Sequence, residues 1–157
     1  MVVDLLELKA RLPAGGRLLG LDVGTKTIGL ALSDSGLTVA APLATLQRGK
    51  FAADVVRLTG IVSERGIAGF VIGLPVGMDG REGPRCQSVR QFAANLQARL
   101  DLPTAFWDER FSTLAVERSL REAEMSHRRR AVVVDKLAAA YILQGALDRI
   151  ARGSAPA

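Results

Sequence analysis

The chain has 157 residues and a mass of 16.7 kDa, which is the size of one domain. Hydrophobic residues make up 48% of it and charged residues 24%, so the chain can bury a core and wholesale disorder is excluded. The formal net charge is +5, and the 21 basic residues comprise 17 Arg and 4 Lys. Because a guanidinium is a forked donor suited to phosphate oxygens, this bias favours a polyanionic partner, with a basic solvated surface as the alternative.

Cysteine and histidine are too scarce for two classes of site. The one cysteine, Cys86, excludes an internal disulfide, and the one histidine, His127, excludes a histidine-rich zinc site. No apolar run approaches the roughly 20 residues of a membrane span. Residues 1–10 carry Asp4 and Glu7 among their leucines and lack the pattern of a signal peptide. We therefore expect a soluble, cytoplasmic protein with no membrane partner.

The first half of the chain predicts a short helix followed by three strands. Leucines between Leu5 and Leu12 indicate an amphipathic helix, and residues 1–16 are interpreted as an N-terminal appendage. Apolar segments then predict strands over Arg17–Val23, Thr27–Ser33 and Leu37–Leu46. Their connections are too short for a crossover, so we expect an antiparallel meander.

In the second half the hydrophobic pattern alternates between helical and strand periods. The predicted elements, in order, are a helix over Phe51–Arg65, a strand over Ile67–Leu74, a Gly/Pro-rich loop over Pro75–Pro84, a helix over Gln87–Leu100, a strand over Pro103–Trp107, a helix over Thr113–Glu124, a basic break over Ser126–Arg130 and a final helix over Ala131–Arg149. Residues 151–157 are small and polar, and we expect a disordered tail there.

This order of elements predicts the fold class. Three strands in a meander, followed by strands that alternate with helices, are typical of the ribonuclease-H-like fold. We therefore expect an α/β domain over residues 17–150, with a mixed five-stranded sheet in the order 3-2-1-4-5 and helices on both faces.

Three acidic residues are candidates for catalysis. Asp22 ends a buried strand, and Glu109 ends another, with Asp108 as the alternative at that position. Asp135 lies near the start of an apolar helix, where an unpartnered buried carboxylate would be costly. The structural alternatives are a turn-forming Asp22, an ion pair with Arg110 at the second position, and an Asp135 that stabilises the helix dipole.

Carboxylates that converge at one edge of a sheet repel each other unless a cation lies between them. Oxygen ligands without His or Cys select Mg²⁺ or Mn²⁺. Two such ions, about 3.5–4 Å apart, stabilise the attacking and leaving oxygens of a phosphodiester displacement. The sequence therefore predicts a metal site formed by Asp22, Glu109 and Asp135 and a hydrolase that acts on ester bonds, as an endo- or exonuclease.

Basic residues near these acids could bind the phosphates of a nucleic acid. Each is a weak signal alone, since charged runs are usually solvated, but together they predict a phosphate-binding surface. Aromatic residues are only 4% of the chain, so we expect recognition by shape and backbone rather than by base stacking. The predicted nucleic-acid-binding residues are Thr25, Lys26, Arg81, Arg85, Arg110, Arg128, Arg129 and Arg130.

Four segments in order resemble one known family. They are residues 19–29 (LGLDVGTKTIG, followed by ALSD at 31–34), residues 71–80 (VIGLPVGMDG), residues 107–113 (WDERFST) and residues 134–144 (VDKLAAAYILQ). The chain resembles the YqgF-type pre-16S ribosomal RNA nucleases, which are also described as Holliday junction resolvases, from about Arg17 to Arg149. The resemblance implies a ribonuclease-H-like fold, a metal-dependent nuclease that matures the 5′ end of 16S ribosomal RNA, and an acidic site at Asp22, Glu109 and Asp135.

Alternative functions remain open at this point. A Holliday junction resolvase would act on branched DNA and would favour a homodimer, whereas an RNA nuclease could be a monomer or a homodimer. A non-catalytic nucleic-acid-binding module is a second alternative. The segment Asp-x-Gly-Thr before a hairpin is also the first phosphate motif of actin-like ATPases and sugar kinases, but those need two such domains and 157 residues cannot supply them.

Overall fold

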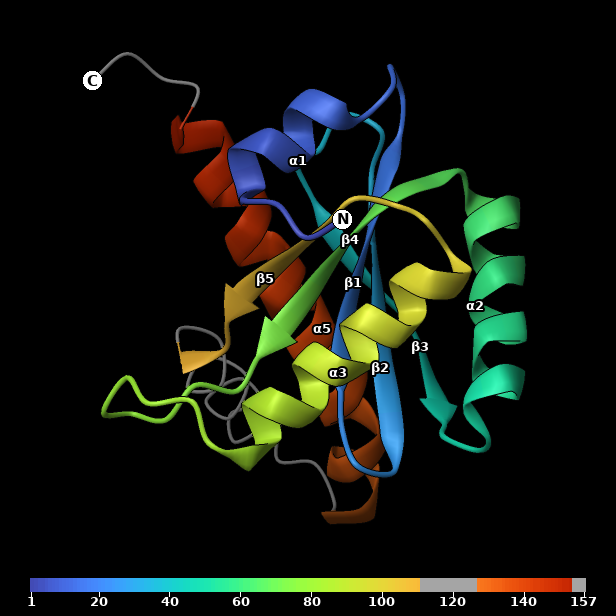
Figure 1. Ribbon diagram of the computed structural model, residues 1–157, viewed down its shortest axis with the longest axis vertical. Coiled ribbons are helices and arrows are strands. Elements are labelled where there is room, and N and C mark those ends of the chain that lie inside the picture. The colour runs from blue at the N-terminus through green and yellow to red at the C-terminus, as the bar shows by residue number, and fades with distance from the viewer. Residues whose placement is uncertain (111–126, 154–157) are drawn as a thin grey trace.

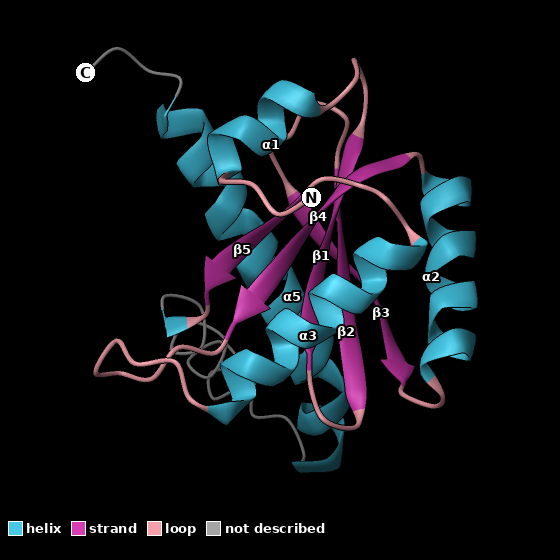
Figure 2. Ribbon diagram, in the orientation of Figure 1, coloured by secondary structure: helices cyan, strands magenta, loops and turns pink. Residues whose placement is uncertain are grey.

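A mixed five-stranded sheet forms the centre of the computed structural model (Figures 1 and 2), in the order β3-β2-β1-β4-β5. The strands are β1 (Arg17–Val23), β2 (Thr27–Ser33), β3 (Ala40–Gln47), β4 (Ile67–Leu74) and β5 (Thr104–Asp108), and the helices are α1 (Leu5–Arg11), α2 (Phe51–Arg65), α3 (Pro84–Arg99) and α5 (His127–Gly153). The structure describes the backbone of residues 1–110 and 127–153 and the side chains of residues 1–110 and 136–153. The helix predicted over Thr113–Glu124 lies outside these residues.

The pairing of the strands confirms the predicted sheet. β1 pairs antiparallel with β2, and β2 pairs antiparallel with β3. β4 pairs parallel with both β1 and β5. The carboxyl ends of β1, β4 and β5 therefore lie at one edge of the sheet, and in α/β folds this edge carries the ligand site.

Two layers of helices cover the two faces of the sheet. One hydrophobic cluster joins the sheet to α2 and α3, and a second joins it to α1 and α5. Figure 1 shows α3 in front of the sheet and α5 behind it. Because side chains alternate along a strand, Leu19, Leu21 and Val23 of β1 belong to the first cluster and Leu18 belongs to the second. By the same alternation, Asp22 lies on the face that α5 covers.

The N-terminal residues are part of this packing. The N–H of Val3 donates to the carbonyl of Thr104 at 2.8 Å, and the N–H of Thr104 donates to the carbonyl of Met1 at 3.0 Å. Residues 1–3 therefore run beside the edge strand β5. Leu8 of α1 is fully buried in the second cluster, so the predicted appendage packs on the sheet through this side chain.

The third strand begins three residues later than predicted, at Ala40 instead of Leu37. Asp34 holds the preceding turn: its Oδ1 accepts from the N–H groups of Thr38 and Val39, and its Oδ2 accepts from the Thr38 hydroxyl at 2.6 Å. These bonds, the Thr38 hydroxyl above all, lower the pKa of Asp34 to about 2. Leu37 takes a positive φ of 57° in this turn and so cannot continue a strand.

The ends of α3, α5 and β5 also differ from the predicted ones. α3 begins at Pro84 instead of Gln87, because proline is well suited to the first helical position. Arg85 therefore lies inside this helix and not in the connection before it. α5 begins at His127, so the basic run Arg128–Arg130 is helical instead of forming a break. The same helix continues through Gly153 and includes Arg152, where a disordered tail was expected. β5 is shifted by one residue, to Thr104–Asp108.

The long helix α5 crosses the whole sheet. It has 27 residues, and Ala139 and Leu143 pack against Gly20 in the middle of β1. Within the described part of the chain, no helix combines the length and the apolar character that crossing a membrane would require.

The close approach of α5 to β1 depends on Gly20. A Cβ added there would lie 2.8 Å from the Leu143 Cβ and 3.1 Å from the Ala139 carbonyl oxygen. We predict that Gly20→Ala lowers the free energy of unfolding by about 1–3 kcal/mol, because the helix must move away from the sheet. The measurement is urea unfolding followed by circular dichroism.

Gly60→Ala is the matched control for that variant. Gly60 is exposed within α2, and a Cβ there would have no atom within 4 Å. The same substitution should raise the free energy of unfolding by about 0.5–1 kcal/mol, because alanine favours the helix. An equal effect of the two substitutions would contradict the packing described here.

Candidate functional site

Asp22 and Glu109 lie together at the carboxyl edge of the sheet. Asp22 is the penultimate residue of β1, and Glu109 follows β5 directly. Strand β4 separates the two, but the N–H of Glu109 donates to the carbonyl of Leu74 at 3.1 Å, which fixes the backbone of Glu109 at the end of β4. The side chain of Glu109 forms a hydrogen bond with Asp22, so the structure brings these two predicted acids into contact.

Gly73 provides the space for this contact. Gly73 lies in β4 opposite Trp107 of β5. A Cβ added at Gly73 would lie 2.9 Å from the Glu109 Cγ, and its closest neighbour would be the Glu109 Oε1. The Glu109 side chain therefore crosses β4 over Gly73, where no side chain blocks it.

Two charged carboxylates this close repel each other unless a proton or a cation lies between them. The pKa of Glu109 is raised to about 8, first by burial and then by the charge and the hydrogen bond of Asp22. Arg85 acts in the opposite direction, and its charge lowers the pKa of Glu109. At neutral pH and without a cation, the Glu109 carboxyl is mainly protonated and can donate to Asp22.

Asp108 has a different role from Glu109. Its Oδ2 accepts from Arg110 Nη2 at 2.6 Å and from Arg110 Nε at 2.9 Å. Burial raises the pKa of Asp108, but the hydrogen bonds from Arg110 outweigh burial and the pKa lies below its ordinary value. The structure thus pairs Asp108 with Arg110 and brings Glu109 to Asp22. Arg110, predicted to bind nucleic acid, has its charge compensated within the chain.

Arg85 lies beside the acids in the first turn of α3. Its Nη2 donates to the carbonyl of Val23 at 2.9 Å, directly after Asp22. The next residue, Cys86, is fully buried, and burial followed by the charge of Glu82 raises the pKa of its thiol. Arg85 is therefore a basic residue at the site, while Cys86 is a core residue.

Three further residues predicted to bind nucleic acid, Thr25, Lys26 and Arg81, lie on two loops at the same edge. Thr25 and Lys26 are exposed on the turn between β1 and β2. On the loop after β4, the N–H of Gly77 donates to the carbonyl of Arg81 at 2.9 Å. The Arg81 side chain is 88% exposed and lies 3.6 Å from the Asp79 carboxylate, which is a weak ion pair. These residues are placed to meet a ligand from solvent.

Asp135 and the basic run are placed by backbone alone. Asp135 lies in α5, four residues before Ala139, which packs over Gly20 of β1. The side chains of Asp135 and of residues 128–130 lie outside the described residues. Among the side chains that the structure describes, no group of three His, Cys, Asp or Glu residues could hold a metal ion.

Two residues at the site were missed in the sequence. Gly73 is an isolated glycine inside a buried strand, a pattern that indicates close approach of other atoms. Arg48 follows β3, and its Nη1 donates to the carbonyl of Gly24 at 2.6 Å. Nothing in the local sequence marks Arg48, because the contact joins residues 24 positions apart.

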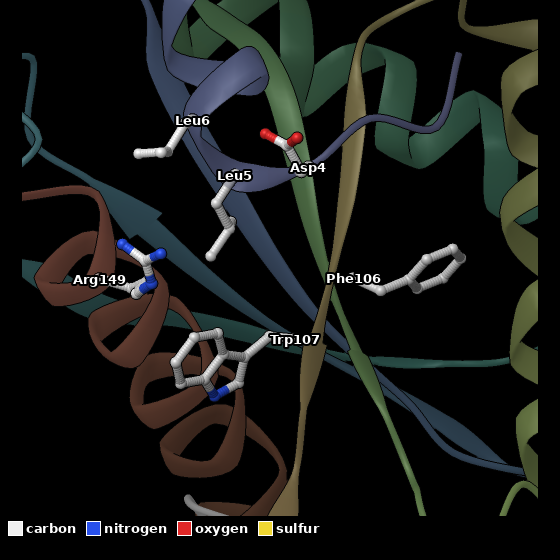
Figure 3. Close-up of a pocket in the computed structure, with 6 residues that line it drawn as sticks. All are labelled: Asp4, Leu5, Leu6, Phe106, Trp107 and Arg149. Atoms are coloured by element: carbon white, nitrogen blue, oxygen red, sulfur yellow. The ribbon is translucent and has the colours of Figure 1, made fainter. Parts of the chain in front are cut away.

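A separate cavity lies between α1, β5 and α5. It has a volume of about 590 Å³ and does not include Asp22 or Glu109. Figure 3 shows Trp107 on the α5 side of β5 and Phe106 on the opposite side. The lining residues are Asp4, Leu5, Leu6, Phe106, Trp107 and Arg149.

Solved structures share the fold of this chain. A Thermus thermophilus RuvC in complex with a Holliday junction substrate matches with a TM-score of 0.50 and 11% identity, over 86% of this chain and 96% of that chain. The yeast mitochondrial Holliday junction resolvase Ydc2 matches with a TM-score of 0.54 and 10% identity, over 92% and 83%. These likenesses support the ribonuclease-H-like fold.

Sequence relatives are much closer. A protein of Paramagnetospirillum magneticum is 61% identical over 142 residues, 90% of this chain and 92% of its own length. One of Roseobacter denitrificans is 58% identical over 149 residues, 94% and 91%. Both carry the name "Putative pre-16S rRNA nuclease". The family model described as "RuvX: Holliday junction resolvase" matches residues 16–149, and the chain therefore belongs to the RuvX family.

Proposed function

We propose that this protein is a metal-dependent nuclease that hydrolyses phosphodiester bonds in the 5′-end maturation of pre-16S ribosomal RNA. The observation that carries the proposal is the contact between Asp22 and Glu109 across Gly73. The names of relatives that are 61% and 58% identical support the substrate.

The acid pair suits a hard divalent cation. Without a cation, burial and the charge of Asp22 raise the pKa of Glu109 to about 8, so the pair retains a proton at neutral pH. Mg²⁺ or Mn²⁺ would compensate both charges in place of that proton, and carboxylate oxygens are the ligands these ions prefer. Asp22 and Glu109 would hold the ion, and Asp135 is proposed as a third ligand from its position on α5.

The chain's own residues would then position the substrate. When bound, the metal would act as a Lewis acid on the scissile phosphate. Arg85 lies beside the acids, where a guanidinium can bind a neighbouring phosphate. Thr25, Lys26 and Arg81 would contact the strand further from the acids, since all three are exposed at the same edge. Arg128, Arg129 and Arg130 are proposed to extend this surface along α5.

A second candidate substrate is a four-way DNA junction. The matching family model is described as a Holliday junction resolvase, and the solved structures with this fold include two junction resolvases. The chemistry at Asp22 and Glu109 would be the same, so only the substrate distinguishes the two candidates.

Asp22→Asn tests the proposed chemistry. We predict that this variant loses Mg²⁺- or Mn²⁺-dependent cleavage by at least about a hundredfold, because a neutral amide replaces a charged ligand while the side chain keeps its size. Binding of RNA and the fold should persist. The measurement is cleavage of a labelled pre-16S leader RNA, with Asp101→Asn as a control at an exposed acid outside the site.

The same assay distinguishes the substrates. Leader RNA and a four-way junction are compared at equal ionic strength, because salt alone shifts the affinity strongly. Faster cleavage of the RNA supports ribosomal RNA maturation, and faster cleavage of the junction supports the resolvase. Unchanged cleavage by Asp22→Asn on both substrates would reject the acid-pair mechanism.

The acid pair also predicts how stability depends on pH. The pKa of Glu109 rises from 4.5 to about 8 on folding, so its contribution to stability is complete below pH 4.5 and is lost as the pH rises through 8. In metal-free buffer, stability should fall by at most roughly 1.4 kcal/mol per pH unit across this window. Glu109→Gln should flatten the fall, whereas the exposed Glu64→Gln should not.

Thermal unfolding with EDTA and with excess Mg²⁺ provides the measurement. Added Mg²⁺ should raise the Tm of the unmodified chain at pH 8 more than that of Glu109→Gln, because the ion replaces the proton between the two carboxylates. Parallel curves for the two proteins, with and without Mg²⁺, would show that Glu109 does not bind the ion.

Gly73→Ala tests the space for Glu109. The added Cβ would collide with the Glu109 carboxylate and with Ile142 Cδ1, which would lie 2.5 Å away, so we predict about tenfold weaker Mn²⁺ binding by calorimetry. Gly69→Ala, in the same strand, also crowds the core because its Cβ would lie 2.9 Å from Leu8 Cδ1, but it should keep Mn²⁺ affinity. Combining Gly73→Ala with Glu109→Asp should restore part of the affinity. Equal losses in the two alanine variants would attribute the effect to strain alone.

A further inference from the structure

Seven of the arginines whose side chains the structure describes fall into two groups by their partners. In the first group, each guanidinium forms an ion pair with a carboxylate, the weakest being the long, exposed pair of Arg81; this group comprises Arg11, Arg57, Arg81, Arg90 and Arg110. Arg48 and Arg85 differ. In the described part of the chain, each donates to a backbone carbonyl and neither forms an ion pair with a carboxylate.

These two arginines bind consecutive carbonyls directly after Asp22. Arg85 donates to Val23 at 2.9 Å from the start of α3, and Arg48 donates to Gly24 at 2.6 Å from the connection between β3 and α2. Two guanidinium groups from distant segments, neither in an ion pair with a described carboxylate, therefore flank the end of β1.

Other contacts fix the position of Arg48. Its N–H donates to the carbonyl of Lys26 at 2.8 Å, which joins its loop to the β1–β2 turn. Its guanidinium carbon lies 5.3 Å from the centre of the Phe92 ring, and Phe51 packs edge-on against that ring. A guanidinium has five N–H donors, and the described contacts use one of them. The group is ordered before any ligand binds and retains free donors and a full charge.

We propose that Arg48 and Arg85 form a two-arginine phosphate-binding site that holds a nucleic-acid strand across Asp22. Arg85 binds a phosphate on the side of Glu109, and Arg48 binds one on the side of the β1–β2 turn. Exposed Lys26 and Lys50 add positive charge beside Arg48. This inference rests on the proposed function only for the nature of the substrate, because the ligand it names is the phosphodiester backbone itself.

Binding without cleavage tests this site. The probe is a fluorescently labelled single-stranded RNA oligonucleotide, with DNA of the same sequence as the second arm, titrated in EDTA at several salt concentrations. Arg48→Gln removes the charge but can still donate to the Gly24 carbonyl. We expect fivefold to tenfold weaker binding, of the order of one lost phosphate contact, and a slope of log K against log salt that is about 0.7 smaller.

Two further variants separate charge from structure. Arg65→Gln makes the same change of charge at an exposed residue in the last turn of α2, and it should leave the slope unchanged. Arg48→Lys keeps the charge and should keep most of the slope. Equal losses of affinity in Arg48→Lys and Arg48→Gln would show that Arg48 only stabilises the β1–β2 turn, and this would overturn the proposal.

The two nucleic-acid arms complete the test. Equal losses of affinity for RNA and for DNA support contact with phosphate. A loss of affinity for RNA alone would overturn the proposal, because it would indicate contact with the 2′-hydroxyl. Because no metal is present, the result does not depend on catalysis. If Arg48→Gln weakens binding while the unmodified chain cleaves neither substrate with metal, the phosphate site stands and the proposed nuclease activity fails.

Discussion

The contact between two carboxylates across a strand that separates them is the constraint on which the rest of the site depends. Asp22 and Glu109 come from strands that are not neighbours, and they meet because Gly73 has no side chain. Bringing like charges together in a partly buried place is unfavourable, and the raised pKa of Glu109 is the direct expression of that cost. The sheet, through the ladder that fixes β5 against β4, holds the pair in this unfavourable arrangement.

The basic residues near the acid pair differ from other arginines in their partners. Arg110 forms an ion pair with Asp108, and Arg90 forms one with Glu82. Close to the acid pair the partners change to backbone carbonyls, and the positive charge stays available. Among the described side chains, Arg90 and Arg110 are paired with carboxylates, whereas Arg48 and Arg85, at the end of β1, donate to backbone carbonyls instead.

Much of the fold could be predicted from the sequence because it depends on local periodicity. β1, β2, β4 and α2 have the boundaries that the hydrophobic pattern indicates, and the order of elements is enough to give the order of the sheet. The start of β3 could not be predicted, since it depends on side-chain bonds of Asp34 to a turn that an apolar pattern does not register.

The site was less predictable than the fold because its decisive contacts are non-local. The sequence places Asp108 and Glu109 next to each other at a strand end, and only the bonds to Arg110 and the room over Gly73 distinguish them. Arg48 carries no motif at all. The role of Asp135 stays a prediction: its backbone position on α5 fits, and its side chain lies outside the described residues.

The burial of Cys86 has a practical consequence for following this molecule in solution. Its thiol is inaccessible and its pKa is raised, so maleimide or disulfide reagents should not react with it. Since no other cysteine exists in the chain, one introduced at an exposed position would be the single reactive thiol. A spin label or fluorophore can then be attached at a chosen surface position without first replacing the native cysteine next to Arg85.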